Sequence, residues 1–326
     1  MAEIVTLGEA LVRLTPPRFH RLETATSLEV EVGGAELNTA AGLVRLGHST
    51  AWVSRVPDSP LGALVRSRVR AAGVDDRFVQ TGAGRAGLYF LEEAAAPRAA
   101  SILYDRAGSS TALAAPGDFD WPRIFDGANW FHVSGITAAL SANAAAVVAE
   151  AMAAADTAGL TVSVDLNFRA KLWSAAEAGR VMSGLLSHCD VLFASESDAA
   201  SLFDITGETY AAVAAKLCER FGLQAVATMR RDAVVLWHDR VRAIGYRAGQ
   251  RYESKAYEVE VVDRLGTGDA FAAGVIDGLL HDDFEQGLET GAAMGALAHT
   301  IRGDLPLISK AEITAALAGD SLRIRR

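Results

Sequence analysis

The chain has 326 residues, of which 50% are hydrophobic and 22% charged, and its formal net charge at pH 7 is −9. This composition is that of a globular protein with ample material for a large core, arranged as one large domain with an appendage or as two domains. The acidic balance and the lack of any run of Lys and Arg argue against a nucleic-acid partner, although they leave room for a locally basic pocket.

Targeting and redox signals are sparse. Cys189 and Cys218 lie outside any CxxC pair, so a disulfide framework or a zinc site has little support. The N-terminus has no basic flank, and no stretch reaches the ~20 apolar residues of a membrane span. We therefore expect a soluble, cytoplasmic protein that does not act at a membrane.

Two patterns alternate in the first part of the chain. Strand-like runs at 4–7 and 51–56 and helical runs at 35–46 and 61–72 give a βα rhythm. Segments 13–32 and 86–106 interrupt it with further strand-like runs at 27–32, 87–92 and 100–105. We expect these segments to form a separate small sheet, which leaves 1–12, 33–85 and 107–326 as the α/β domain.

From residue 129 onward the rhythm becomes regular. Strands are expected at 130–133, 161–166, 190–194, 225–228, 233–237 and 257–262, and helices at 141–158, 175–187 and 210–221. This alternation predicts a mainly parallel sheet with helices on both faces. Ligands of such sheets bind beyond the carboxyl ends of the strands, where we expect Gly34, Asn167, Arg169, Ser195, Thr228 and the loop 266–269.

The segment 261–271 carries the strongest chemical signal. A strand-like run turns through Gly266, Thr267 and Gly268 and enters an apolar helix at 270–280. Glycines that adopt φ > 0 turn backbone N–H groups toward one point, and the helix aims its positive end there, which makes a cradle for phosphate. Asp269 at its rim would be an ionised base for a hydroxyl proton. The alternative is a tight turn with an aspartate as helix cap.

The segment from Asp263 to Phe271 resembles the Asp-Thr-Thr-Gly-Ala-Gly-Asp-Ala-Phe signature of the ribokinase-like PfkB family of carbohydrate kinases. The Gly33-Gly34-Ala35-Glu36-Leu37-Asn38 turn, followed by Arg45-Leu46-Gly47, resembles the family's other motif. The resemblance covers essentially the whole chain. It implies a ribokinase-like fold in which the small sheet is a lid, and in this family the lid often doubles as a dimer interface.

Within the family the chain is most similar to the kinases of 2-keto-3-deoxygluconate. The similarity lies in Tyr89, in the runs 104–109, 165–169 and 172–173, and in Gly303-Asp304. A sugar acid needs Arg and Tyr donors for its carboxylate, which Tyr89, Tyr104, Arg106 and Arg169 would supply. Alternatively, the two arginines are surface or ion-paired residues, and Arg169 alone does not select an acid because fructokinase-like members share Asp-x-Asn-x-Arg.

The resemblance assigns further roles. It implies sugar binding by Gly33, Gly34, Asn38 and Asp304, and nucleotide binding by Asn167, Ser195, Thr228, Arg230, Gly266 and Gly268. It implies that Asp263 helps to order the loop together with a monovalent cation such as potassium. Alternatively, Asp263 is a simple turn cap. The segment Ser195-Glu196-Ser197-Asp198 departs from the family's Asn-x-x-Glu, which positions Mg²⁺ through water, so Asp198 would be a shorter substitute. Arg264-Leu265 and Thr267 also depart from the signature but keep its glycines and aspartate. We interpret His299 as a helix-packing residue.

The sequence therefore predicts a homo-oligomeric enzyme that transfers the γ-phosphoryl of ATP, with Mg²⁺, to a sugar acid, most directly the terminal hydroxyl of 2-keto-3-deoxygluconate. Asp269 would take the proton, and the amides of 265–268 would hold the phosphoryl charge. One alternative is a fructokinase- or ribokinase-type kinase of a neutral sugar, and another is a non-catalytic sensor. A nicotinamide dehydrogenase ranks last, because the first βα turn lacks the Gly-x-Gly-x-x-Gly fingerprint.

Overall fold

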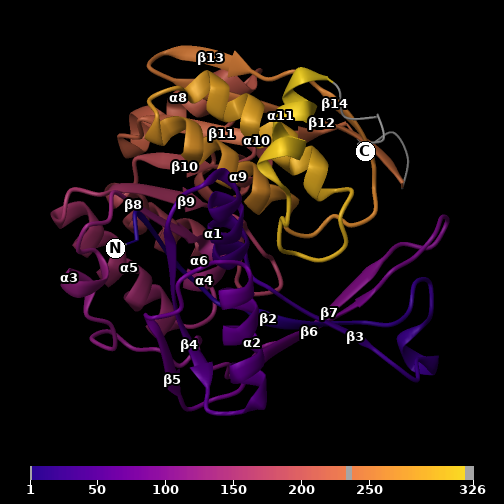
Figure 1. The fold of residues 1–326 in the computed structure, drawn as a ribbon. Coiled ribbons are helices and arrows are strands. Elements are labelled where there is room, and N and C mark those ends of the chain that lie inside the picture. Colours follow the sequence, from indigo (N-terminus) through magenta and orange to yellow (C-terminus); the bar gives the residue numbers. More distant parts are fainter. Residues whose placement is uncertain (1, 233–236, 320–326) are drawn as a thin grey trace.

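The structure is a computed structural model that describes residues 2–232 and 237–319. A large sheet with helices on both faces forms the body, and a small four-stranded sheet projects from one side of it (Figure 1). None of the described helices is both long and apolar enough to cross a bilayer.

The large sheet has ten strands among the described residues, in the order β13-β12-β11-β10-β9-β8-β1-β4-β5, with β14 paired to β12. Neighbours from β5 to β11 are parallel, and β12, β13 and β14 add antiparallel pairs. The strands are β1 (Ile4–Leu7), β4 (Thr50–Pro57), β5 (Val79–Gly82), β8 (Trp130–Ser134), β9 (Thr161–Asp165), β10 (Val191–Phe193), β11 (Ala225–Arg231), β12 (His238–Arg247), β13 (Gln250–Glu253) and β14 (Tyr257–Glu260).

Alternating residues of the parallel strands feed cores on opposite faces of the large sheet, as in β1, where Ile4 packs on one side and Val5 on the other. The first face carries α1 (Ala35–Leu46), α2 (Pro60–Ala71), α9 (Thr267–Leu280), α10 (Phe284–Ala298) and α11 (Lys310–Ala318). The second carries α3 (Trp121–Ile124), α5 (Ala142–Thr157), α6 (Ala175–Leu185), α7 (Glu196–Phe203) and α8 (Tyr210–Phe221). The short elements are η1 (Leu22–Thr24), α4 (Gly135–Ala138) and η2 (Leu186–His188).

The small sheet has the order β3 (Glu29–Gly33), β2 (Leu11–Thr15), β6 (Gly87–Glu92) and β7 (Ser101–Asp105). Its cross-strand neighbours sort into an apolar and a polar face. One row across the four strands is Val30, Leu14, Phe90 and Leu103, and the adjacent row on the opposite face is Glu31, Arg13, Tyr89 and Tyr104. The polar row includes Tyr89 and Tyr104, which line the cleft described below.

Local sequence patterns predict many element bounds well. The helices expected at 35–46 and 210–221 occur with those bounds, because glycine in the left-handed region ends both. The helix expected from residue 270 begins at Thr267, and the strand expected at 257–262 ends at Glu260. The patterns did not predict β5, β12, β13 or α7. The strand expected at 233–237 falls largely outside the described residues.

Candidate active site

A cleft of about 1290 Å³ opens between the carboxyl ends of the parallel strands and the polar face of the small sheet. Most of the residues predicted from the sequence line it together. They are Gly33, Gly34, Asn38, Tyr89, Tyr104, Arg106, Asn167, Arg169, Ser195, Asp198, Thr228, Gly266, Thr267, Gly268, Asp269 and Asp304. The two predicted site residues that do not line the cleft are Arg230 and Asp263.

The N-terminus of α9 forms one end of the cleft. Gly266 is its N-cap and adopts φ 75°, in the left-handed region, and a Cβ there would lie 2.0 Å from the carbonyl oxygen of Asp304. Gly268 differs from the prediction, because it lies within the helix without a positive φ, and a Cβ there would meet no atom within 4 Å. The first-turn amides of a helix have no intrahelical acceptor, so this end can bind an anion.

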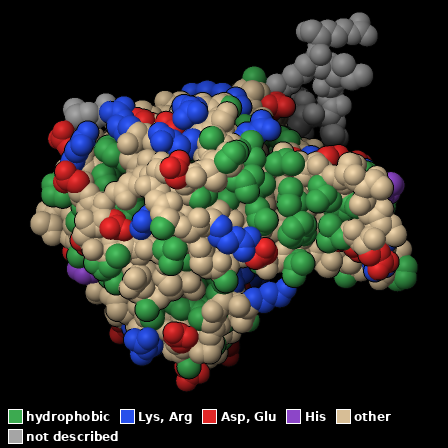
Figure 2. Space-filling view, turned by 90° about the horizontal axis from the view of Figure 1, so that it is seen from below, with side chains coloured by type: hydrophobic (Ala, Val, Ile, Leu, Met, Phe, Trp, Pro, Cys, Tyr) green, Lys and Arg blue, Asp and Glu red, His purple; other side chains and the backbone are tan. Residues whose placement is uncertain are grey.

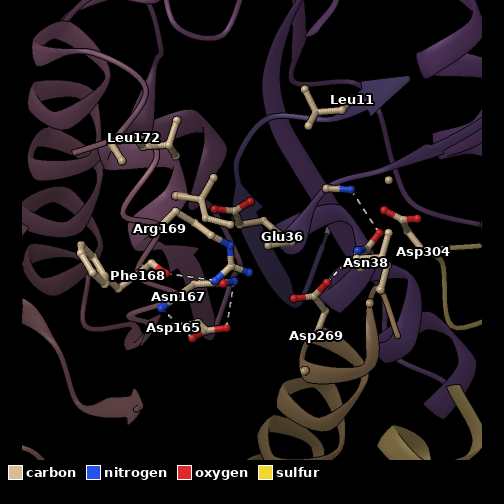
Figure 3. Close-up of a pocket in the computed structure, with 18 of the residues that line it drawn as sticks. Leu11, Glu36, Asn38, Asp165, Asn167, Phe168, Arg169, Leu172, Asp269 and Asp304 are labelled. Atoms are coloured by element: carbon tan, nitrogen blue, oxygen red, sulfur yellow. Dashed lines mark hydrogen bonds between the residues drawn. The ribbon is translucent and has the colours of Figure 1, made fainter. Parts of the chain in front are cut away.

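Asp269 lies in the first turn of α9, with only 9% of its surface exposed. Its Oδ2 accepts a hydrogen bond from Nδ2 of Asn38 at 2.7 Å, and its carboxylate points toward Arg169 and Asp165 (Figure 3). Burial raises the pKa of Asp269 to about 7, with Glu36 and Asp304 adding to the rise and Asn38 opposing it. The sequence predicted a fully ionised carboxylate, whereas this pKa leaves Asp269 about half ionised at neutral pH. A pKa near the working pH suits a group that accepts a proton.

Asp304 sits opposite, where the turn that contains Gly33 meets the loop that leads into α9. Both of its carboxylate oxygens accept from the hydroxyl of Tyr89, at 2.7 and 2.6 Å. A Cβ on Gly33 would lie 2.3 Å from the Cβ of Asp304, so only glycine fits there. Burial raises the pKa of Asp304, although Arg13 and Tyr89 oppose the rise.

The arginines predicted for a substrate carboxylate have different surroundings. Arg106 donates from Nε and Nη2 to the same oxygen of the buried Glu9, which is the ion-paired arrangement that the sequence left open. Arg169 donates to the carbonyl of Phe168 at 3.2 Å, and its guanidinium lies in the cleft between Asp165 and Asp269 (Figure 3). Tyr104 packs beside Tyr89, with ring centroids 5.7 Å apart.

The far end of the cleft contains Ser195 and Asp198. They form a capping box at the start of α7: Oγ of Ser195 accepts from the amide of Asp198 at 3.1 Å, and Oδ2 of Asp198 accepts from that hydroxyl at 2.7 Å. Their immediate role is to hold the helix start. Among the described residues no group of three or more acidic, His or Cys side chains could enclose a metal ion. In nucleotide-dependent enzymes Mg²⁺ is commonly bound by one or two carboxylates together with substrate phosphates and water.

Arg230, predicted to contact the nucleotide, does not line the cleft, and its nucleotide contact stays a prediction. Its guanidinium pairs with Glu196 outside the cleft, whereas Arg231 lines the cleft and donates to Oγ1 of Thr267 at 3.0 Å. Side chains alternate along β11, so a shift of one residue moves an arginine to the other face. Strand β11 runs three residues beyond the predicted end, which is why its alternation was not applied there.

Two further carboxylates in the cleft, Asp165 and Glu36, were not predicted as site residues from the sequence. Burial raises the pKa of Asp165 to about 8, and the neighbouring Asp269 adds to it. Glu36 is fully buried, and its Oε1 accepts from the amide and hydroxyl of Ser134 and from the hydroxyl of Thr137 at 2.6–2.9 Å. Both residues stand inside the motifs that carried the resemblance, and their places at a strand end and in a first helical turn were the available signals.

Asp263 and His299 support the loop from outside the cleft. Oδ1 of Asp263 accepts from the amides of Arg264 and Leu265 at 2.8 and 3.1 Å, which is a turn cap. Its Oδ2 accepts from Nη2 of Arg13 at 2.6 Å. His299 is fully buried, bonds through Nδ1 to the carbonyl of Gly295 and has its pKa lowered by burial to about 4.

The chain is similar to known sugar kinases over nearly its whole length. The sequence pattern of the pfkB family of carbohydrate kinases matches residues 1–309, and the chain belongs to that family. A 2-dehydro-3-deoxygalactonokinase from Haloferax volcanii is 36% identical over 100% of this chain and 99% of its own length. A 2-dehydro-3-deoxygluconokinase from Bacillus subtilis is 28% identical over 93% of this chain and 91% of its own. The crystal structure of 2-dehydro-3-deoxygluconokinase from Thermotoga maritima superimposes with a TM-score of 0.95 at 36% identity, covering 98% of this chain and 100% of that one.

The two glycines of the α9 loop give a matched pair of variants. Gly266→Ala places a Cβ against a backbone oxygen at a positive φ, so we expect it to lower the free energy of unfolding by about 1–3 kcal/mol or more. Gly268→Ala should fold normally but narrow the anion site and raise the KM for ATP. Chemical denaturation and steady-state kinetics of both variants check this. Equal stability of the two variants would contradict the assigned backbone roles.

Proposed function

We propose that this enzyme transfers the γ-phosphoryl of ATP to the terminal hydroxyl of a 2-dehydro-3-deoxy sugar acid, of gluconate or galactonate configuration. The observation that carries the proposal is the placement of Asp269, a buried carboxylate with a pKa of about 7, at the N-terminus of α9 and in one cleft with Arg169 and Asp304. The names of the similar proteins support an acid substrate, and the acids that they name differ in configuration at C4.

The residues divide the chemistry between them. Asp269 in its ionised form accepts the proton of the attacking hydroxyl, and Asn38 holds its carboxylate in place. The amides at the start of α9 stabilise, by hydrogen bonding, the negative charge on the phosphoryl group during its transfer. Mg²⁺ would be held chiefly by phosphate and water, and it would supply positive charge beside the nucleotide. Positioning and electrostatic stabilisation supply most of the catalysis in such a transfer.

The acid end of the substrate would lie among Tyr104, Arg106 and Arg169. Arg106 donates from Nε and Nη2 to Glu9, and this ion pair weakens its attraction for a substrate carboxylate. Its Nη1 remains as the nitrogen that could contact the substrate. Arg169 therefore becomes the stronger candidate for the carboxylate. Gly33, Gly34 and Asp304 would bind the sugar hydroxyls at the other side of the cleft.

The nucleotide would extend from the α9 loop toward Asn167, Ser195 and Thr228, with Arg231 near its phosphates. Because Ser195 and Asp198 are engaged in a capping box, we infer that Asp198 would contact Mg²⁺ through a water molecule, as the sequence suggested. A potassium ion at Asp263 stays a prediction, and Arg13 already supplies a positive charge on that carboxylate. Dependence on ATP favours a cytoplasmic enzyme.

The small sheet acts in this proposal as a lid formed by the segments 13–32 and 86–106. Its polar face lines the cleft through Tyr89 and Tyr104, so closing it would exclude the water that otherwise hydrolyses ATP. The remaining segments would form the body of the protein that binds nucleotide and sugar.

The apolar face of the lid fits a second copy of this chain. On this face, the residues next to the body are Val12 and Val32, which are buried in a core shared with α1 and α2. Farther out, Val30 is 43% and Leu103 is 62% exposed. Hydrophobic side chains gather on this projecting lobe (Figure 2). An apolar surface that continues outward from a core is typical of an interface, so we propose a homodimer through the lid.

A kinase of a neutral sugar, such as fructose, is the second candidate. The Glu9–Arg106 pair favours it, because a neutralised arginine suits hydroxyl groups as well as carboxylates. A coupled assay with ATP against C4-epimeric 2-dehydro-3-deoxy sugar acids and neutral ketoses decides between them. Turnover of ketoses alone would overturn the acid assignment, and no turnover of any sugar would favour the non-catalytic sensor.

Asp269→Asn should lower kcat by roughly 10²–10⁴-fold, the range for a lost general base, with ATP binding largely retained. The wild-type kcat/KM should fall about tenfold per pH unit below a pKa of about 7, because only the ionised carboxylate accepts a proton. Residual turnover of the variant should lack this dependence. Asp282→Asn, a change at an exposed residue far from the cleft, is the control, and wild-type-like turnover by Asp269→Asn would remove Asp269 from its role.

Arg169→Ala should raise the KM for the sugar acid by about 10–100-fold, the loss of one charge-assisted hydrogen bond. The KM for any neutral ketose that the enzyme accepts should change little, which makes the ketose the matched control. Arg106→Ala should have a smaller effect, since Glu9 shares its charge. Equal losses on acid and ketose would contradict the carboxylate assignment.

The oligomer proposal predicts a dimer for the wild-type protein in sedimentation equilibrium and a monomer for Leu103→Asp, because a charge cannot be buried at an apolar interface without a large cost. Leu307→Asp alters another exposed leucine, on the body, and should remain dimeric. A monomeric wild type, or a dimeric Leu103→Asp, would refute the lid interface.

A further inference from the structure

Arg13 is a buried cation that neither the motifs nor the proposed chemistry uses. It lies on β2, in the polar row of the lid between Glu31 and Tyr89, and its side chain has no exposed surface. It does not line the cleft. Whatever it does for the reaction, it must do through its neighbours.

Every nitrogen of the Arg13 guanidinium has a partner. Nη1 donates to Oδ1 of Asp304 at 2.8 Å, and Nη2 donates to Oδ2 of Asp263 at 2.6 Å. Nε donates to Oγ1 of Thr15 at 3.1 Å and lies 3.2 Å from Oε2 of Glu31. Burial by itself lowers the pKa of Arg13, but Tyr89 and the carboxylates of Asp263 and Asp304 outweigh it, so the net shift is upward.

These partners belong to separate parts of the active site. Asp263 caps the loop that leads into α9, and its Oδ2 also accepts from the amide of Gly303 at 3.2 Å. Asp304 faces the substrate and packs against Gly33 and Gly266. One planar guanidinium therefore joins the lid strand, the phosphate loop and the substrate-binding carboxylate, with the fixed donor directions that lysine lacks.

Stability alone is a poor explanation for this arrangement. Removing a charged pair from water costs several kcal/mol per ion, and well-packed apolar replacements are often as stable. A buried ionic group is better explained when it fixes one arrangement among several. The arrangement fixed here places the acceptor site and the anion site at a set distance.

We propose that Arg13 is a positioning residue for phosphoryl transfer: its guanidinium holds Asp304 and the Asp263 loop in a single geometry with the lid. This inference rests on the proposed kinase activity, but it holds for whichever sugar the enzyme phosphorylates. Misplacement of reacting groups by about 1 Å can cost roughly 10²-fold in rate, which sets the expected size of the effect.

The experiment compares Arg13→Met and Arg13→Lys with Arg98→Met. Arg98 is also an arginine of the lid segments, paired with Glu92, but it does not line the cleft. Each variant is assayed well below its melting temperature with the acceptor that the wild type uses best. Steady-state kinetics gives kcat and the KM for acceptor and ATP, and calorimetry without ATP gives the Kd for the acceptor.

Arg13→Met should lower kcat by about 10²-fold and also weaken acceptor binding in calorimetry, because both the phosphate loop and Asp304 lose their fixed position. Arg13→Lys should fall between it and the wild type, since one ammonium keeps the charge but not the fork. Arg98→Met should match the wild type. Acceptor-independent ATP hydrolysis should increase relative to transfer in Arg13→Met.

A lower melting temperature with unchanged kcat, KM and Kd in the folded Arg13→Met protein would overturn the inference and leave a structural arginine. So would full activity in Arg13→Met together with loss in Arg98→Met. If Arg13→Met does not fold, Arg13→Lys decides: wild-type kcat and acceptor Kd there refute the need for a guanidinium. The proposed substrate is judged separately, by the wild-type acceptor panel.

Discussion

The close packing of Asp304 against two glycines is the constraint on which the active site depends. Its side chain lies where a Cβ on Gly33 would be, and its carbonyl oxygen lies where a Cβ on Gly266 would be. Gly33 belongs to the N-terminal motif and Gly266 to the C-terminal one. The contact therefore places the start of α9, the turn before α1 and the Asp304 carboxylate in mutual contact, and it explains why two motifs more than 200 residues apart lie in one cleft.

An acidic cleft in an enzyme that handles anions needs a physical account. Among the residues that the structure describes, seven carboxylates line the cleft: Glu9, Glu36, Asp105, Asp165, Asp198, Asp269 and Asp304. Burial raises the pKa of Asp165 and Asp269 toward neutrality, hydrogen bonds hold Glu36, and Arg106 neutralises Glu9. The negative charge that faces a ligand is therefore smaller than the count suggests. Arg169, Arg231 and the positive end of α9 bring positive charge to the same cleft.

The sequence predicted the parts of this protein that local patterns encode. The helices at 35–46 and 210–221 have clear ends, and the βα rhythm correctly predicted a mainly parallel sheet with a separate small sheet. The antiparallel strands β12 and β13 escaped prediction because polar and charged residues at 238–240, 242, 247 and 250–251 leave only short apolar runs, although 240–243 does alternate. Residues of the cleft that stand in motifs were found, whereas Arg231 required the register of a strand that local patterns ended too early.

Arg13 shows a different limit of sequence reasoning. It stands in the run Leu11-Val12-Arg13-Leu14-Thr15, where an arginine between apolar residues is typical of a strand with one wet face. The patterns did not predict strand β2, and its polar face does not meet solvent, because loops from residues 263 and 303, about 250 and 290 positions away, cover it. Only tertiary contact decides whether a polar face meets solvent or other charges. The same alternation that turns Arg13 inward turns Val12 and Leu14 to the other face, so the lid's apolar surface and its ionic centre arise from one strand.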